Sequence, residues 1–285
     1  MTTDRIIARL FGGAGNQMFQ YAAARALADT LCCELQIDNR YVAGSADRGD
    51  CFQHYQNARF TRDGTLPPAK SDGWLRYGLW RAFGASPRIY REKTLGFDPA
   101  LLTLPKGSYL HGYWQSERYF ASIADQLRTD LTFTTALDDA NAAMATQIDR
   151  AANPTAFHVR RGDYIASGTY AAMTPDYYRA AARHIAEQAG PITCFVFSND
   201  PSWAQDNLNL GHETVIVDIN DETTGHFDLH LQSLCAHNVI ANSTFSWWAA
   251  WLNPDPDKIV VAPKSWFNDP KLSNPDLIPL RWTQI

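Results

Sequence analysis

Residues 5–38 read RIIARLFGGAGNQMFQYAAARALADTLCCELQID, and this stretch sets the fold class. It begins with an apolar run over 5–11, turns at 12–15, and continues over 17–31 with alanine and leucine at helical spacing. A second apolar run over 34–38 follows. A strand, a glycine turn, a helix and a strand in this order are typical of a doubly wound α/β unit. We therefore predict an α/β fold.

The rest of the first half is less regular. Residues 41–108 show no clear period, so no helix or strand is predicted for them. A strand over 109–113 and helices over 116–127 and 137–151 are predicted next. Asn153 and Pro154 then interrupt the helical pattern. We place the domain boundary there and expect two domains, 1–153 and 154–285.

The second half alternates strands and helices. Apolar strand patterns cover residues 155–160, 192–198, 214–218, 239–242 and 258–262. Helical patterns fill the gaps over 175–189, 201–208, 227–236 and 245–252. Alternation of this kind favours a parallel sheet with helices on both faces.

Length and composition exclude several classes of protein. The 285 residues are 45% hydrophobic and 19% charged, which is typical of a globular chain long enough for two domains. The formal net charge of -5, without a basic cluster, argues against nucleic-acid binding and for a small-molecule partner. Five cysteines without a C-x-x-C pair indicate reduced thiols. No signal segment or transmembrane stretch is found, so we expect a cytoplasmic protein, compatible with peripheral association at the inner face of the membrane.

Two adjacent cations follow the first strand of the second half, in HVRRGDY at 158–164. The guanidinium groups of Arg160 and Arg161, beside Gly162, suit a clamp for a pair of phosphates, because arginine is planar and always charged. The alternative is an ordinary ion pair in which one arginine only neutralises Asp163.

Two further polar sequences follow strand ends. In FSNDP at 197–201, Ser198 and Asn199 precede a proline; such a loop can bind a ribose or a base, but by itself it favours a helix cap. In NSTFSWW at 242–248, hydroxyl side chains stand at a helix start, where the helix dipole suits a phosphate. The tryptophans of this second stretch are expected to pack in the core.

The glycine turn near the amino terminus has two interpretations. Gly13 and Gly15 match a dinucleotide fingerprint whose third glycine is missing, and Asp38 stands near the place of its ribose-binding acid. An NAD(P)-linked oxidoreductase therefore remains an alternative. No lysine follows the glycines, which excludes the phosphate loop of nucleoside triphosphatases. Asn16 instead places an amide at the helix start, which suits a sugar hydroxyl or a phosphate.

Metal ligands are poorly represented. Asp255 and Asp257 lie in a proline turn ahead of a strand. His226 and His230 stand four residues apart with Asp228 between them, but no third ligand is evident. We therefore predict no metal site.

Four motifs together resemble the bacterial α-1,2-fucosyltransferases. They are GGAGNQMFQYA at 12–22, GYWQSERYF at 112–120, HVRRGDY at 158–164 and NSTFSWWAAWL at 242–252, and the resemblance spans residues 6–266. It implies a GT-B-like fold in which two Rossmann-like domains hold the active site in the cleft between them. It also implies inverting transfer of L-fucose from GDP-L-fucose to the 2-hydroxyl of a terminal galactoside, without a metal or another cofactor.

The resemblance also implies roles for individual residues. Arg160 corresponds to the first arginine of the H-x-R-R motif, which holds the pyrophosphate, and Asp228 to a reader of the guanine edge. The implied donor-binding residues are Gly15, His158, Arg160, Arg161, Ser198, Asn199, Asp228, Ser243, Thr244 and Phe245. The implied acceptor-binding residues are Asp38, Tyr113, Trp114 and Gln115.

Asn16, Arg160 and Asp163 are expected to be catalytic. Asp163 is the first choice for the base that deprotonates the acceptor, and Asp38, His158 or a water relay are its rivals. A carbohydrate-binding protein without catalysis is the third class considered, beside the transferase and the oxidoreductase.

Overall fold

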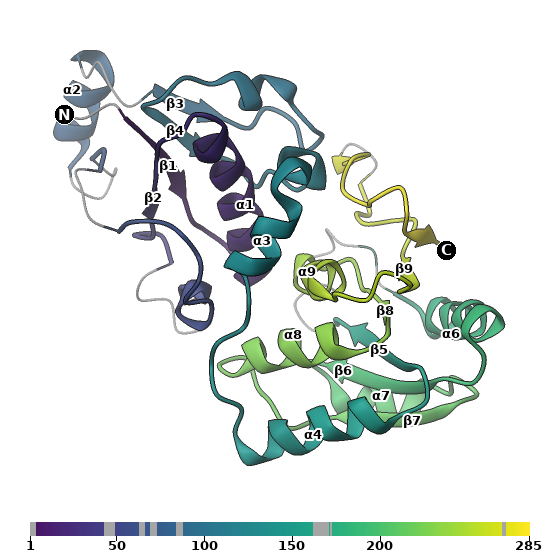
Figure 1. The fold of residues 1–285 in the computed structure, drawn as a ribbon. Helices are drawn as coiled ribbons and strands as arrows, with labels where there is room; N and C mark the ends of the chain where they lie inside the picture. The colour runs from purple at the N-terminus through teal and green to yellow at the C-terminus, as the bar shows by residue number, and fades with distance from the viewer. Residues whose placement is uncertain are drawn as a thin grey trace. The chain divides into compact units, whose positions relative to one another are not determined.

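The computed structural model describes residues 4–42, 49–62, 66–68, 73–83, 88–161, 171, 173–269 and 272–285. The chain divides into two compact units, Met1–Thr132 and Phe133–Ile285. Each unit contains one sheet of parallel strands (Figure 1). The predicted α/β class is therefore confirmed.

The first unit is built on a four-stranded sheet with strand order β2-β1-β4-β3. Its strands are β1 (Arg5–Arg9), β2 (Glu34–Asp38), β3 (Arg88–Arg91) and β4 (Ser108–His111). Its helices are α1 (Ala14–Thr30), α2 (Trp74–Phe83) and α3 (Ala124–Asp130), with 3-10 turns η1 (Cys51–His54), η3 (Pro99–Thr103), η4 (Glu117–Tyr119) and η5 (Ala121–Ile123). Helix α1 is buried along most of its length, because its alanines allow close packing on β1 and β2.

Two buried glutamines of α1 hold the loops at its start. Gln20 accepts a hydrogen bond from the backbone N–H of Phe11 at 3.0 Å and donates to the carbonyl of Phe11 at 3.2 Å. Gln17 donates to the carbonyls of Gly12 and Gly49, both at 3.0 Å. These bonds satisfy backbone groups of a half-buried turn at Phe11 and Gly12 and of the exposed Gly49. Gly12 has φ +80°, a conformation that favours glycine.

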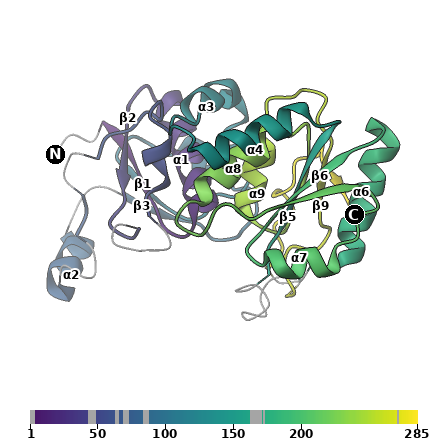
Figure 2. The ribbon, with the colours of Figure 1, turned by 90° about the horizontal axis from the view of Figure 1, so that it is seen from below.

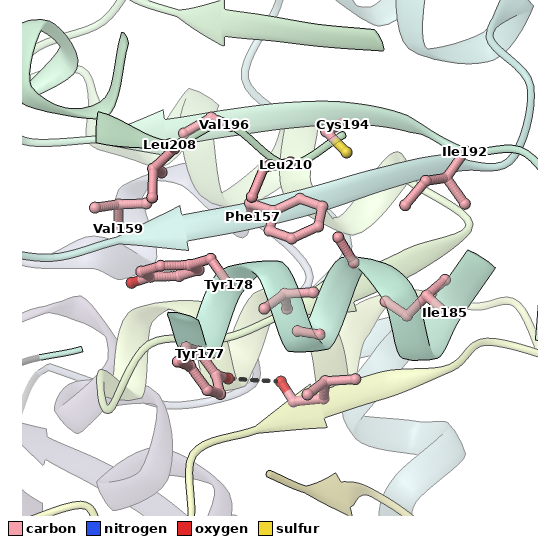
Figure 3. Packing of buried hydrophobic residues seen from close by; sticks show 14 of the residues in the cluster. Phe157, Val159, Tyr177, Tyr178, Ile185, Ile192, Cys194, Val196, Leu208 and Leu210 are labelled. Atoms are coloured by element: carbon pink, nitrogen blue, oxygen red, sulfur yellow. Dashed lines mark hydrogen bonds between the residues drawn. The ribbon is translucent and has the colours of Figure 1, made fainter. Parts of the chain in front are cut away.

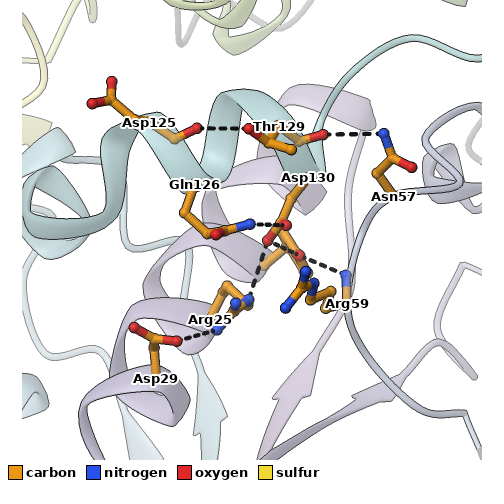
Figure 4. A network of polar contacts seen from close by, with 9 residues as sticks. Arg25, Asp29, Asn57, Arg59, Asp125, Gln126, Thr129 and Asp130 are labelled. Atoms are coloured by element: carbon orange, nitrogen blue, oxygen red, sulfur yellow. Dashed lines mark hydrogen bonds and ion pairs between the residues drawn. The ribbon is translucent and has the colours of Figure 1, made fainter.

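A buried carboxylate joins α1 to α3 (Figure 4). Asp130 is 1% exposed and accepts hydrogen bonds from Tyr21 Oη at 2.9 Å, Arg25 Nε at 3.1 Å and Gln126 Nε2 at 2.8 Å. The hydroxyl of Tyr21 in turn accepts from the backbone N–H of Arg59 at 3.0 Å. Two helices and a loop are thus held by one charged group with all of its partners in place.

The second unit has a six-stranded sheet with strand order β10-β9-β8-β5-β6-β7. Its strands are β5 (Pro154–Val159), β6 (Thr193–Ser198), β7 (Glu213–Val217), β8 (His237–Val239), β9 (Val260–Ala262) and β10 (Thr283–Gln284). Its helices are α4 (Asp139–Arg150), α6 (Pro175–Ala189), α7 (Pro201–Asn207), α8 (Gly225–Leu234) and α9 (Thr244–Leu252). The five strands and four helices predicted for residues 155–262 are confirmed, with small shifts at their ends.

Apolar side chains fill both faces of this second sheet. On one face, Phe157 and Val196 pack against Tyr178 and Ile185 of α6 (Figure 3). The other face contains Phe195, which belongs to a cluster shared with α4 and α8. Because successive strand residues point to opposite faces, one continuous apolar strand serves two cores.

The boundary between the units differs from the one expected after Asn153. Ile148 of α4 is fully buried in the core shared with α8, so α4 belongs to the second unit. The sequence break at Asn153 and Pro154 marks only the passage from α4 into β5. Residues 41–108, for which nothing was predicted, contain α2 and β3, two short elements whose side chains are mostly exposed or half-buried. Exposure of this kind leaves no apolar period to read.

We expect Asp130→Ala to lower the free energy of unfolding by about 3–5 kcal/mol, because it removes the buried acceptor of Arg25 Nε and Tyr21 Oη and leaves Arg25 with the exposed Asp29 as its acid. The measurement is urea denaturation. The matched control is Asp125→Ala on the same helix, since Asp125 is fully exposed and forms a surface pair with Arg128; it should change the free energy by about 0.5 kcal/mol or less. Equal effects of the two variants would contradict this role for Asp130.

Candidate functional site

The end of strand β5 is joined to the start of helix α9 through His158. This residue is 6% exposed, and its Nδ1 shares a hydrogen bond of 2.9 Å with Oγ of Ser246. The hydroxyl of Tyr178 donates to the carbonyl of His158 at 3.1 Å. The ring centroids of His158 and Phe245 lie 5.5 Å apart. Burial, together with the charge of Arg160, lowers the pKa of His158 to about 3. His158 is therefore neutral at ordinary pH and acts in positioning.

The two arginines after β5 have different surroundings. Arg161 donates its backbone N–H to Oδ1 of Asn199 at 2.9 Å, and its guanidinium lies 3.6 Å over the centroid of Trp203. Its Nε is 3.7 Å from a carboxylate oxygen of Asp200. Arg161 thus has Asp200 as a nearby acid. The predicted ion pair with Asp163 stays a prediction, because Asp163 lies outside the described residues. Arg160 is half-buried beside His158.

Two predicted residues of this loop, Gly162 and Asp163, lie outside the described residues. The expected base Asp163 therefore stays a prediction.

The loop after β6 is a helix cap, as its sequence by itself favoured. Asp200 accepts from the backbone N–H of Trp203 at 3.1 Å at the start of α7, and Ser198 accepts from the N–H of Asp200 at 2.9 Å. Asn199 is held by Arg161. The loops after β5 and β6 are therefore connected, because these strands are neighbours in the sheet.

Helix α9 begins with small polar residues, as predicted. Ser243 stands at its N-cap without a side-chain capping bond, and Thr244 and Phe245 are half-buried. Trp247, Trp248 and Trp251 are buried, which confirms their place in the core. The first N–H groups of a helix have no intrahelical acceptor and carry partial positive charge, so this start suits an anion.

A buried amide supports the same helix start. Asn242 is 1% exposed and donates to the carbonyls of Ala171 and Trp266, both at 2.8 Å. Its Oδ1 is buried without a hydrogen-bond partner in the described part of the chain. The bonds of Asn242 fix the strand-to-helix passage that precedes Ser243.

Asp228 of helix α8 has an unusual environment. It accepts a hydrogen bond from Nδ2 of Asn220 at 2.7 Å, and the amides of Asn220 and Asn141 are hydrogen-bonded to each other. Burial, with a smaller contribution from Asp218, raises the pKa of Asp228 to about 6 against the hydrogen bond from Asn220. The carboxyl thus titrates near neutral pH, as functional groups often do.

The start of α1 holds the residues expected from the first glycine motif. Gly15 lies buried in its first turn. Asn16 accepts a hydrogen bond from Nε2 of Gln115 at 2.9 Å, so the first two sequence motifs meet here. Tyr113 and Trp114 donate their backbone N–H groups to the carboxylate of Glu92 at 2.8 and 2.9 Å. Glu92 was not predicted, because it lies in the irregular stretch before β4.

Two predicted acceptor residues are not available to an acceptor. Trp114 is 1% exposed and packs against Tyr90 and Tyr119, so its ring belongs to the core. Asp38 is fully buried and receives bidentate hydrogen bonds of 2.8 Å from Arg40. Burial raises its pKa, but the hydrogen bonds from Arg40 and Tyr109 outweigh this and lower it. The half-buried Tyr113 still fits the acceptor prediction.

The hollow on the surface of the first unit does not contribute to this site. A hollow of about 550 Å³ lies near the amino ends of β1 and β2, lined among others by Arg5, Cys33 and Glu34. In parallel sheets, ligands bind at the opposite edge. Within the described ranges, no three His, Cys, Asp or Glu side chains come together as a metal site would need. None of the helices described there has the length and apolar character needed to cross a bilayer.

The chain is similar in sequence to a known family and to several named proteins. Residues 91–285 match glycosyl transferase family 11. Alpha-1,2-colitosyltransferase of Escherichia coli is 30% identical over 291 residues, which cover 98% of each chain. Galactoside alpha-(1,2)-fucosyltransferase 1 of Pan troglodytes is 27% identical over 263 residues, which cover 85% of this chain and 63% of the relative.

The fold is also similar to solved structures. Fucosyltransferase NodZ from Bradyrhizobium has a TM-score of 0.54 at 12% identity, covering 89% of this chain and 95% of NodZ. A crystal of NodZ alpha-1,6-fucosyltransferase soaked with GDP-fucose gives a TM-score of 0.54 at 15% identity, covering 88% and 93%. This likeness confirms the predicted GT-B-like fold.

We expect the raised pKa of Asp228 to make stability depend on pH. Between about pH 4 and pH 6 the folded carboxyl holds its proton while the unfolded one, with its ordinary pKa of 3.8, has lost it. The free energy of unfolding therefore falls as pH rises through this window. Asp228→Asn removes this titration. Its free energy of unfolding, measured relative to that of the wild type, should therefore be about 1–3 kcal/mol higher at pH 7 than at pH 4.

Melting temperatures of both proteins from pH 4 to pH 8 test this expectation. Asp206→Asn, an exposed position on α7, is the control and should follow the wild-type curve. If the curve of Asp228→Asn also ran parallel to the wild type, the pKa of Asp228 would be normal.

Proposed function

This chain belongs to glycosyl transferase family 11, and on that premise we propose that it transfers L-fucose from GDP-L-fucose to the 2-hydroxyl of a terminal galactoside. The relative from Pan troglodytes is named a galactoside alpha-(1,2)-fucosyltransferase, a name that gives the transferred sugar, the linkage and the kind of acceptor. The observation that carries the proposal is the bond between His158 and Ser246, which brings the end of β5, and with it the loop that begins at Arg160, beside the start of α9. Two sources of positive charge thus face the place where a diphosphate would lie.

Arg160 binds the diphosphate in this proposal, and the first N–H groups of α9 also donate hydrogen bonds to it. Glycosyl transfer passes through an oxocarbenium-like state while negative charge grows on the leaving group. Fixed donors that are already oriented stabilise that charge without a metal ion. Arg161 supports the loop from its place on Trp203, and Asn199 fixes its backbone. Asp228, with its pKa near neutrality, is the proposed contact to the guanine edge.

Burial argues against two of the candidates for the base that deprotonates the acceptor. His158 is buried with a low pKa, and Asp38 is buried under Arg40, so neither reaches an acceptor hydroxyl. Asp163 or a water relay remains. A reactive oxocarbenium ion needs little help from a base.

A colitosyl donor is the second candidate. The relative that aligns over 98% of this chain is named an alpha-1,2-colitosyltransferase. A donor panel that compares GDP-fucose with GDP-colitose on one galactoside separates the two candidates.

We expect Arg160→Ala to lower the rate of transfer by about 10²- to 10³-fold, because one oriented donor to the leaving diphosphate is lost. The measurement is transfer of radiolabelled fucose from GDP-fucose to a galactoside in the presence of a metal chelator. Arg183→Ala, an exposed arginine on α6, is the matched control and should keep full activity. Normal transfer by a folded Arg160→Ala protein would reject the assignment.

Helix α2 supports peripheral binding to a membrane surface. It stands apart from the sheet of the first unit in both views (Figures 1 and 2). Trp74, Leu75 and Leu79 lie on one side of the helix and are 79%, 57% and 55% exposed. Tyr77 and Trp80 are half-buried and contact each other. The sequence of α2 contains two arginines and no acid, which suits an interface with anionic lipid.

We expect the protein to sediment with vesicles that contain phosphatidylglycerol, and less with vesicles of phosphatidylcholine alone. Replacing Trp74, Leu75 and Leu79 together by serine should weaken binding about a thousandfold or more, since each inserted side chain contributes about 1.5–3 kcal/mol. Leu280→Ser, at a fully exposed position outside α2, is the control. Binding of the triple variant at the wild-type level would exclude α2 as the contact.

A further inference from the structure

The four strands of the first sheet end in a row of polar residues, Asp38, Arg9, His111 and Arg91. Arg9 pairs with Asp38 between β1 and β2, and Arg91 pairs with His111 between β3 and β4. The pairing of Ala8 with Leu110 brings Arg9 beside His111. Residues in register on parallel strands point to the same face, so the four side chains form one line at the carboxyl edge. We call these four residues the strand-end row.

The one carboxylate of the row, Asp38, is already neutralised by a neighbouring arginine. The carboxylate of Asp38 receives two hydrogen bonds of 2.8 Å from Arg40 and one of 2.7 Å from Tyr109. Among the described residues, neither Arg9 nor Arg91 forms an ion pair with a carboxylate. Two cations of the row therefore lack a counter-charge in this part of the chain.

Arg9 is held in place by ring contacts. Its guanidinium lies 3.5 Å from the ring centroid of Tyr41 and 5.6 Å from that of Phe11. Its Nε is buried without a hydrogen-bond partner among the described residues. A fixed guanidinium whose donors are not all used is well prepared to bind an anion, because little side-chain freedom remains to be lost.

His111 adds a neutral donor between the two cations. Nη1 of Arg91 lies 2.6 Å from its Nδ1, and arginine has no acceptor atom, so Nδ1 is the acceptor. Burial, with Arg9 and Arg91, lowers the pKa of His111 to about 4. The ring is therefore neutral near pH 7 and carries its proton on Nε2.

An aromatic surface adjoins the row. The ring of Phe11 lies 5.6 Å from that of His111 and 4.8 Å from that of Tyr113. Aromatic rings beside oriented polar donors are typical of small-molecule sites, and the carboxyl edge of a parallel sheet is where ligands bind.

We propose that the strand-end row binds an anionic group, a carboxylate or a phosphate, of the acceptor. This inference rests on the proposed function, because it names the class of acceptor. Planar guanidinium groups recognise carboxylate and phosphate through paired hydrogen bonds. The bound anion would also relieve the repulsion between Arg9 and Arg91, which no carboxylate of the described residues offsets.

Three acceptors with the same terminal galactose test the proposal. They are galactosyl-glucose, galactosyl-glucuronate and galactosyl-glucose 1-phosphate. The wild type should have a lower KM for one of the two anionic acceptors than for the neutral one, and which of them it is identifies the anion. Arg91→Gln should raise that KM about tenfold or more, leave kcat within twofold, and leave the KM of the neutral acceptor unchanged.

Arg88→Gln is the matched control. Arg88 is an exposed arginine on the same strand, three residues away and on the other face, and its replacement should change neither KM. Equal KM values of the wild type for all three acceptors, or an equal increase for neutral and anionic acceptors in Arg91→Gln, would overturn the proposal.

Calorimetric binding of the acceptors without donor keeps the two hypotheses apart. Absence of fucosyl transfer to every acceptor would count against the proposed function, whatever the binding data show. Tighter binding of an anionic acceptor by the wild type than by Arg91→Gln would still support the row. Equal affinity of both proteins for all three acceptors would overturn it.

Discussion

The hydrogen bond between Nδ1 of His158 and Oγ of Ser246 is the contact on which the second unit's site depends. It connects the end of an interior strand to the first turn of α9, and so brings the loop that begins at Arg160 next to a helix start. Because burial keeps His158 neutral, the bond involves no buried charge. The hydroxyl of Tyr178, from α6, holds the same strand end from its carbonyl. Local rigidity of this kind is what oriented donors require.

The arginines of the chain differ in how their charge is used. Arg25 and Arg40 are paired with buried carboxylates, and Arg161 lies on an aromatic ring near an acid, so these three stabilise the fold. Arg9 and Arg91 have no such carboxylate partner in the described residues. Burying a charge is costly unless it is paired. The half-buried Arg9 is therefore better explained by a ligand than by stability, whereas the exposed Arg91 is solvated and enters the row through its bond to His111.

Much of the second unit could be predicted from its sequence. Its strands are buried on both faces and appear as continuous apolar runs, and Pro201 with Asp200 marks a helix start. The first unit was harder to predict. Strand β3 has four residues with exposed ends, and α2 keeps three large apolar side chains exposed, so neither shows a buried period. Helix α4 was assigned to the wrong unit because its contacts with α8 are distant in sequence.

The sequence by itself determined the α/β class, the motifs that point to glycosyl transfer, and the polar residues at strand ends, because these depend on local pattern and residue type. Tertiary structure alone decided which of those residues are buried and which partners each one has. Asp38 and Trp114 were predicted to bind the acceptor but are buried. No role was predicted for His111 and Arg91, which lie side by side at the carboxyl edge of the first sheet. Exposure and partnership depend on the pairing of strands far apart along the chain, and a local sequence pattern does not contain that pairing.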